Sequence, residues 1–313
     1  MSRSPASIPN LFIVGQPKSG TTALHQFLDE HPDIFMSPYK EPSYFCADFH
    51  RESDAYHGKQ IYFPIRNRDQ YLELFSAVKA ERIVGESSVN YLYSETAAED
   101  IKRFNPNAKI IIILRDPADF LHSLYQMNVR RTWEPGISLR HALELEEQRR
   151  QGRLLPSNVN FPSNLFYSKR AGYHDQVKRF VECFDSKQIK ILIYEDFQSD
   201  NARWYREVLG FLEVEPTFQP EFRIVNPSGS VRHAHLNALL RQRWIVKLGY
   251  SMIPKSKHVW IQQNVIKRLF AKDSPPPLDD KLRLFLRTQL APEVEKISGL
   301  LNEDLFKKWG YQR

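Results

Sequence analysis

The chain has 313 residues, of which 42% are hydrophobic and 26% charged, and this composition supplies enough apolar material for a large folded core. Lysine and arginine outnumber aspartate and glutamate by 44 to 37, which favours acidic ligands but also fits a surface that only aids solubility. No apolar run approaches the roughly 18–20 residues of a membrane-spanning helix, and residues 1–10 lack the apolar stretch of a secretory signal. These features exclude disordered, collagen-like and coiled-coil architectures, and we expect a soluble protein without a transmembrane segment.

Cysteine usage suggests a cellular compartment. Cys46 and Cys183 are the only cysteines, and their separation fits neither a disulfide framework nor the ligand spacing of a metal site. The histidines form no metal-ligand pattern either. We therefore expect two reduced thiols, no metal and a cytoplasmic location.

Four apolar runs predict buried parallel strands. The first, residues 11–15, leads through a loop of small residues into a helix with one apolar face, which His31-Pro32 ends. The other strands are expected at residues 82–85, 109–114 and 189–194, with helices over residues 94–104, 117–130 and a stretch ending near Phe184. Strands that alternate with helices in this way predict the α/β class, with a central parallel sheet covered by helices on both faces.

The C-terminal part reads as mainly helical. Residues 138–151 are highly charged and predict an exposed helix, residues 201–212 predict another, and residues 274–277 form a short break before two final helices. The sequence has no internal repeat and no long linker. We expect one domain over residues 1–313, with a nucleotide-binding core at about 10–200 and a helical part at about 201–313.

Residues 15–22 have the spacing of a phosphate-binding loop, with four residues between Gly15 and Gly20 and two threonines after them. Thr21 stands where ATPase loops have lysine, and the lysine lies earlier, at Lys18. A glycine-rich turn at a helix start offers backbone N–H groups and a positive dipole end to an anion. The loop by itself also fits a plain turn of small residues. The displaced lysine and the lack of an evident Mg²⁺-binding aspartate argue against a kinase.

Two segments together resemble the cofactor motifs of sulfotransferases that use 3′-phosphoadenosine 5′-phosphosulfate (PAPS). Residues 17–22, Pro-Lys-Ser-Gly-Thr-Thr, are similar to the family's 5′-phosphosulfate loop, and residues 113–117 with Ser123 are similar to its 3′-phosphate motif. Arg115 leaves a strand end as a fork-shaped donor, and Ser123 lies two turns into the next helix, facing the same anion. The resemblance implies a P-loop-like sulfotransferase fold, PAPS as cosubstrate and no metal. Because the sequence shows neither a Golgi anchor nor cysteines to form a disulfide, we expect a bacterial-type soluble member.

The resemblance also assigns roles to these residues. Lys18 would meet the bridging oxygen of the leaving phosphate, and Arg115 and Ser123 would hold the 3′-phosphate. The 5′-phosphate would be held by the backbone amides of Ser19, Gly20 and Thr21 and the hydroxyls of Thr21 and Thr22. A later loop, residues 226–232, would cover the nucleotide through Ser228 and Arg232, although a helix-capping loop also fits it.

A third segment narrows the resemblance to the carbohydrate and glycosaminoglycan branch of the family. Residues 40–45, Lys-Glu-Pro-Ser-Tyr-Phe, are similar to that branch's Lys-Glu-Pro-x-x-Phe, whose glutamate is the catalytic base. Glu41 would thus take the acceptor's hydroxyl proton and Lys40 would support the sulfuryl oxygens, unless the two form only an exposed charged pair. Residues 85–91 resemble the branch's Gly-Glu-Lys-Ser/Thr-Pro-x-Tyr, with Ser87 and Val89 in place of Lys and Pro.

We therefore expect an enzyme that moves the sulfuryl group of PAPS to a hydroxyl of a carbohydrate or glycolipid, with Glu41 as general base. A small natural product or a lipid is the next acceptor class. More distant alternatives are a nucleotide-dependent kinase and a non-catalytic phosphate-binding module. The basic clusters at residues 130–131 and 149–153 lack interleaved aromatic residues, so no nucleic-acid partner is expected. His122 is not expected to be the base, because it neighbours Ser123.

Overall fold

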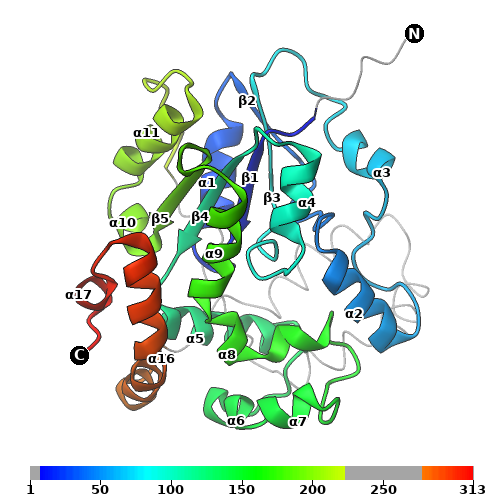
Figure 1. Cartoon of the computed structure of the whole chain (residues 1–313), viewed down its shortest axis with the longest axis vertical. Helices are drawn as coiled ribbons and strands as arrows, with labels where there is room; N and C mark the ends of the chain where they lie inside the picture. Colours follow the sequence, from blue (N-terminus) through cyan, green and yellow to red (C-terminus); the bar gives the residue numbers. More distant parts are fainter. Residues whose placement is uncertain (1–7, 223–276, 313) are drawn as a thin grey trace, which may run out of the picture.

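The computed structural model describes residues 8–222 and 277–312, in which five strands form one sheet (Figure 1). The spatial order is β2-β3-β1-β4-β5, and every neighbouring pair is parallel. The strands are β1 (Leu11–Gly15), β2 (Ile34–Met36), β3 (Ile83–Ser87), β4 (Lys109–Leu114) and β5 (Ile189–Ile193). The predicted α/β class with a central parallel sheet is confirmed.

The edge strand β2 is the element of the sheet that the sequence pattern missed. It has three residues and pairs with β3 from Ile34 opposite Ile83 to Met36 opposite Gly85. A run of three residues is too short for an apolar pattern to separate a strand from a loop. The other four predicted strands agree with the structure to within two residues at each end.

Helices pack on both faces of the sheet, and α9 crosses in front of it in Figure 1. The helices that surround the sheet or follow it are α1 (Thr21–Asp29), α2 (Ala47–His57), α3 (Arg68–Glu73), α4 (Ala97–Phe104), α5 (Pro117–Arg130), α6 (Leu139–Glu144), α7 (Glu146–Arg150), α8 (Tyr167–Arg170), α9 (Tyr173–Cys183), α10 (Tyr194–Ser199), α11 (Asn201–Leu212), α16 (Asp280–Leu301) and α17 (Leu305–Trp309).

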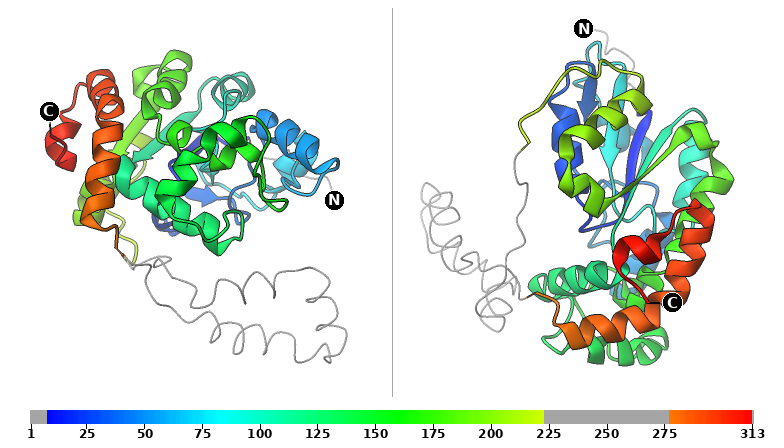
Figure 2. Two further views of the ribbon diagram at one scale, coloured as in Figure 1. Left: turned by 90° about the horizontal axis from the view of Figure 1, so that it is seen from below. Right: turned by 90° about the vertical axis from the view of Figure 1, so that its left-hand side faces the viewer.

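Alternate residues of the central strands enter two separate cores. Leu11 and Ile13 of β1 belong to the core shared with α1 and α11, whereas Phe12 and Val14 belong to the core shared with α4, α5, α9 and α16. A parallel strand buried on both faces reads as a continuous apolar run, which is why β1 and β4 were clear in the sequence. The described C-terminal helices are part of this packing, because α16 lies against α5 and α9 (Figure 2).

The charged stretch over residues 138–151 differs from its prediction. It forms two short helices, α6 and α7, and the Arg149 side chain in α7 is only 1% exposed. Arg149 donates two hydrogen bonds to the buried Glu134, at 2.9 and 2.6 Å. The prediction of one exposed helix was therefore wrong. Arg149 can be buried because its charge is compensated by the carboxylate of Glu134, which lies outside the charged stretch.

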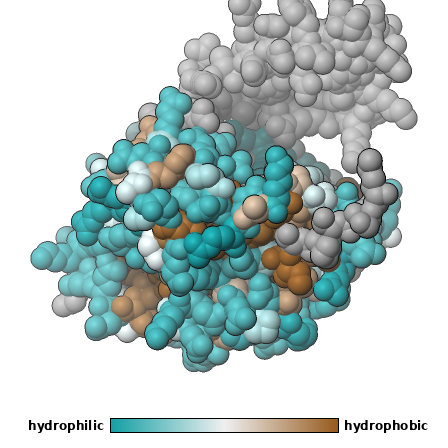
Figure 3. All heavy atoms as spheres, turned by 90° about the horizontal axis from the view of Figure 1, so that it is seen from above, coloured by the Kyte–Doolittle hydropathy of each residue, from teal (hydrophilic) through white to brown (hydrophobic). Residues whose placement is uncertain are grey.

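The helix predicted from residue 94 begins at Ala97. Cys46 and Cys183 are both free thiols, as expected. Among the described residues no helix combines the length and apolar character needed to span a membrane. Figure 3 shows one face of the molecule, which is mostly hydrophilic with separate apolar patches. The single domain over residues 1–313, with its core at about 10–200 and its helical part at about 201–313, stays a prediction.

Candidate active site

A cavity of about 280 Å³ lies where the carboxyl ends of the five strands meet. A residue that follows each strand lines it, and segments beyond α5 close its other side. Because β1 and β4 are neighbours whose connections leave in opposite directions, this is the edge where α/β sheets bind ligands. The lining residues are Pro17, Lys18, Gly20, Thr21, Thr22, Ala23, Glu41, Val89, Asn90, Arg115, Ser123, Met127, Arg131, Trp133, Asn160, Asn164, Arg170 and Tyr194.

The cavity brings together most of the residues singled out from the sequence. Lys18, Gly20, Thr21, Thr22, Glu41, Arg115 and Ser123 all line it. Ser19 is fully buried and Lys40 is beside Glu41, and neither is among the lining residues. Ser228 and Arg232 lie outside the described residues. The individual roles assigned to these residues stay predictions.

The loop between β1 and α1 adopts a conformation that suits anion binding. Lys18 and Gly20 have positive φ angles of 64° and 81°, and Gly20 directly precedes the first residue of α1. A side chain at residue 20 would place its Cβ 3.2 Å from the Tyr194 ring, so glycine fits both the backbone and the space. The start of α1 thus opens onto the cavity with no side chain capping it.

Positive charge is concentrated at this end of the cavity. Burial, followed by repulsion from Arg130, Arg115 and Arg131 in that order, lowers the pKa of the Lys18 ammonium to about 8. Glu41 acts in the opposite direction. Like charges held this close favour a bound anion, because an anion would relieve their mutual repulsion.

Arg115 connects the exit of β4 to the loop. Its Nη1 donates to the Lys18 carbonyl oxygen at 3.1 Å, and its guanidinium lies 4.8 Å from the centre of the Tyr194 ring. Its Nε is buried without a hydrogen-bond partner among the described residues. Ser123 lines the same cavity from α5. An arginine at a cavity wall is suited to bind a phosphate, because its guanidinium carries several N–H donors and a fixed positive charge.

Residues from the C-terminal helices brace the turn that carries Arg115. The carboxylate of Asp116 is 2% exposed and accepts hydrogen bonds from Arg287 Nη2 at 2.8 Å and from the Tyr311 hydroxyl at 3.0 Å. The Asp116 N–H donates to Glu195 Oε1, and Glu195 Oε2 accepts from Trp309 Nε1 at 3.0 Å. No sequence pattern relates these distant residues to the site.

Glu41 is held by hydrogen bonds that start in β3. Its N–H donates to the Ser87 carbonyl oxygen at 2.9 Å, and its Oε1 lies 3.2 Å from Lys40 Nζ. Two residues later, the Ser43 N–H donates to Ser88 Oγ, and that hydroxyl donates to Glu86 Oε2 at 2.7 Å. Glu86 is fully buried, and burial raises the pKa of its carboxyl to about 7. The loop that presents Glu41 therefore rests on a buried polar cluster.

The other lining residues come from segments that carry none of the sequence motifs. Arg131 and Trp133 follow α5, Asn160 and Asn164 precede α8, and Arg170 ends α8. No contiguous motif marks these residues, so only their convergence in space could have identified them.

His122 is not among the lining residues, and burial lowers the pKa of its imidazole. Within the described residues no cluster of three histidines, cysteines or carboxylates has the arrangement of a metal site.

Two curated proteins are similar to this chain over two thirds of its length or more. Human bifunctional heparan sulfate N-deacetylase/N-sulfotransferase 3 is 30% identical over 222 residues, which are 67% of this chain and 23% of that protein. Human carbohydrate sulfotransferase 15 is 25% identical over 266 residues, covering 71% of this chain and 46% of that protein. The chain thus spans about a quarter of the first relative and less than half of the second.

A solved structure extends the similarity to nearly the whole chain. The crystal structure of a sulfotransferase from Alicyclobacillus acidocaldarius has a TM-score of 0.69 and 27% identity, and the match covers 97% of this chain and 99% of that one. The sulfotransferase domain matches residues 9–228, which include all five strands and the cavity. The chain therefore belongs to the sulfotransferase family.

Proposed function

We propose that the protein transfers the sulfuryl group of PAPS to a hydroxyl of a carbohydrate acceptor, in line and with Glu41 as general base. The observation that carries this proposal is the convergence of Lys18, Arg115 and Glu41, from the ends of three strands, on one cavity. The relatives named for heparan sulfate and carbohydrate sulfation support a carbohydrate acceptor.

The donor fits the positively charged end of the cavity. The loop from Lys18 to Thr22 and the start of α1 would hold the 5′-phosphate through backbone amides and threonine hydroxyls. Arg115 and Ser123, which both line the cavity, would hold the 3′-phosphate. Ser228 and Arg232 remain the proposed cover of the nucleotide.

The chemistry assigns opposite tasks to Lys18 and Glu41. The acceptor oxygen forms a bond to sulfur, the bond from sulfur to the bridging oxygen breaks, and the acceptor proton passes to the Glu41 carboxylate. The Lys18 ammonium stabilises the negative charge that develops on the leaving phosphate. Lys40, 3.2 Å from the Glu41 carboxylate, is the second cation that can approach the sulfuryl oxygens. We also propose a cytoplasmic location, consistent with the two free thiols.

Transfer of label from radiolabelled PAPS tests the proposal. Polysaccharides and small alcohols are offered separately, so that a carbohydrate acceptor is distinguished from a natural-product or lipid hydroxyl. Lys18→Ala is expected to abolish transfer, whereas substitution of the exposed Lys187 by alanine is expected to leave it unchanged. Labelled phosphate transfer from ATP in the presence of Mg²⁺, with none from PAPS, would support a kinase and refute the proposal.

A further inference from the structure

The loop that carries Glu41 has a backbone conformation that its own residues do not favour. Glu41 and Ser43 have positive φ angles of 61° and 52°, although neither is a glycine. Residues with a side chain are strained in this left-handed region, so such angles persist only where surrounding contacts impose them. The Glu41 carboxylate contacts Lys40, but Lys40 is its neighbour in the chain and cannot fix where the loop lies. The position of Glu41 therefore depends on contacts between this loop and the rest of the fold.

Hydrogen bonds from outside the loop hold its backbone. The Glu41 N–H donates to the Ser87 carbonyl oxygen at 2.9 Å, as described above. The Ser43 N–H donates to Ser88 Oγ at 2.9 Å, and the Ser43 carbonyl oxygen accepts from His50 Nε2 at 2.8 Å. Ser43 is 3% exposed, so water could not easily replace a lost partner of its N–H. Of these contacts, the one with Ser88 uses a side chain that can be altered without changing the backbone.

Ser88 also connects the loop to the strand that carries the donor loop. It directly follows β3, and its own N–H donates to the carbonyl oxygen of Ile13 in β1 at 3.1 Å. The chain runs from β1 into the turn that contains Lys18. Ser88 thus contacts the segment of Glu41 through its side chain and the segment of Lys18 through its backbone.

The Ser88 hydroxyl has a fixed direction. It donates to Glu86 Oε2 at 2.7 Å, while Glu86 Oε1 accepts from the hydroxyls of Tyr71 and Tyr91 at 2.9 and 2.6 Å. An ionised carboxylate can accept all three hydrogen bonds, because it has no proton of its own to place. Since the Ser88 proton points to Glu86, the lone pairs of its oxygen are left for the Ser43 N–H. Glu86 and Ser88 are both 0% exposed, so water does not compete for these contacts.

We infer that Ser88 is a positioning residue for the base: its hydroxyl, held by the buried Glu86, fixes the loop that presents Glu41. This inference rests on the proposed function, because it takes Glu41 as the general base. In-line transfer requires the acceptor oxygen and the leaving oxygen on opposite sides of sulfur, so the rate depends on how Glu41 and Lys18 lie relative to each other. Ser88 is not among the residues that line the cavity, and it therefore acts through Glu41 rather than on a substrate.

Kinetics with two acceptors test the inference. Ser88→Ala is expected to lower kcat with an alcohol acceptor about 10- to 100-fold, the effect of a displaced catalytic group, with little change in affinity for 3′-phosphoadenosine 5′-phosphate (PAP). With an acidic phenol the loss is expected to fall below about threefold, because less proton abstraction is needed. In a Glu41→Gln background, Ser88→Ala is expected to lower kcat by less than about threefold, since the base is already absent. A merely structural serine would lower kcat equally with both acceptors and in both backgrounds.

Hydrogen exchange of the Ser43 amide, followed by NMR, tests the contact without relying on catalysis. The Ser43 N–H is expected to exchange at least about tenfold faster in Ser88→Ala than in the wild type, measured relative to the amides of β1. Ser88→Cys remains informative if the alanine variant does not fold. A thiol has nearly the same shape as the hydroxyl but is a weak donor and acceptor, so intermediate changes in kcat and in exchange are expected.

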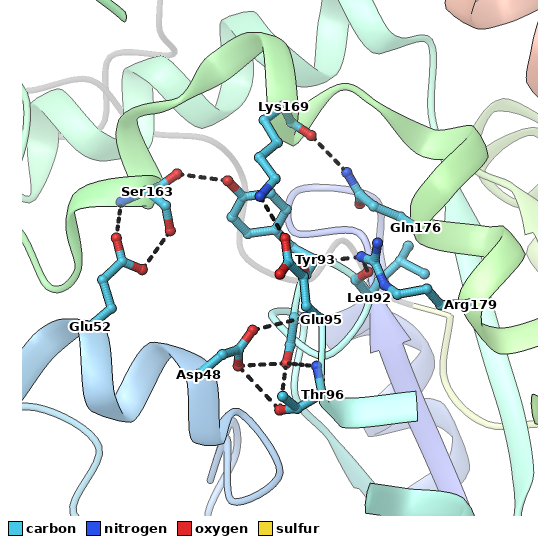
Figure 4. A network of polar contacts seen from close by, with 11 residues as sticks. Asp48, Glu52, Leu92, Tyr93, Glu95, Thr96, Ser163, Lys169, Gln176 and Arg179 are labelled. Atoms are coloured by element: carbon cyan, nitrogen blue, oxygen red, sulfur yellow. Dashed lines mark hydrogen bonds and ion pairs between the residues drawn. The ribbon is translucent and has the colours of Figure 1, made fainter. Parts of the chain in front are cut away.

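Ser94→Ala is the matched control. Ser94 is also 0% exposed, and its hydroxyl likewise donates to a carboxylate, Asp48 Oδ1, at 2.7 Å and accepts from a backbone N–H, that of Ala97, at 3.2 Å. The same Asp48 carboxylate accepts from the Glu95 N–H and the Thr96 hydroxyl (Figure 4). These partners lie outside residues 40–43. Ser94→Ala is therefore expected to leave kcat and the exchange of the Ser43 amide at their wild-type values.

The outcomes separate this inference from the proposed function. Wild-type kcat or wild-type Ser43 exchange in Ser88→Ala overturns the inference, as does an equal loss of kcat with both acceptors. If Glu41→Gln loses turnover of the alcohol and Ser88→Ala does not, the proposed base stands and only the inference fails. If Ser88→Ala loses turnover and Glu41→Gln does not, both fail. A wild-type protein without sulfuryl transfer would refute the proposed function, and the exchange measurement would then decide alone whether Ser88 holds the loop.

Discussion

The pKa of Lys18 provides a quantitative test of the donor end of the cavity. Burial and three neighbouring arginines lower this pKa to about 8. At pH 8 about half of the free protein therefore carries a neutral lysine, and at pH 7 about one tenth does. A bound phosphate restores the charge, because an opposite charge nearby raises the pKa of an ammonium group. We expect PAP binding to take up about 0.5 proton at pH 8 and about 0.1 at pH 7.

The sign of the pH dependence follows from this proton uptake. The complex binds more protons than the free protein, so the affinity for PAP falls as the pH rises through the pKa of free Lys18. The expected loss between pH 8 and pH 9 is about fivefold, provided that the lysine in the complex stays protonated. The phosphate of PAP contributes little in this range, because its second pKa lies near 6.

Titration calorimetry in two buffers of different ionisation enthalpy measures the uptake directly. Lys18→Ala is expected to lose it, whereas Lys187→Ala, which removes an exposed lysine, is expected to retain it. An uptake of less than about 0.1 proton at pH 8, or an equal uptake in Lys18→Ala, would refute the reasoning that the donor anion contacts this lysine.

Three further predictions concern the rest of the site. Arg115→Ala is expected to reduce the preference for PAP over AMP by about 1.5–3 kcal/mol in calorimetry. Arg103→Ala makes the same charge change at an exposed residue and is expected to leave that preference intact. An unchanged preference in Arg115→Ala would assign the 3′-phosphate to another part of the protein. Glu41→Gln is expected to lower kcat about 10²–10⁴-fold with an alcohol acceptor while the affinity for PAP stays the same. With an acidic phenol as acceptor, part of the lost kcat is expected to return. Turnover of the alcohol at the wild-type rate would exclude Glu41 as the base. Tyr311→Phe removes one of the hydrogen bonds to buried Asp116. It is expected to lower the free energy of unfolding by about 1–2 kcal/mol in urea titration and to weaken PAP binding. An unchanged PAP affinity would show that the contact between Tyr311 and Asp116 does not affect Arg115.

The sequence determined the features that are local along the chain. The strand at residues 11–15, the loop after it and the start of α1 form one continuous segment, so the apolar run, the glycine spacing and the helical pattern could be read together. Arg115 and Ser123 were placed in the same way, since a strand end and a position two turns into the next helix depend only on local geometry.

Which distant segments meet depends on the packing of the whole fold. The three residues of β2 form a strand because β3 offers them hydrogen-bond partners. The burial of Arg149 has the same origin, because Glu134 packs against its side chain. The contact of Tyr311 with Asp116 joins residues 195 positions apart. Such pairings depend on how helices and strands pack, and a side chain's own neighbours in the sequence carry no information about them.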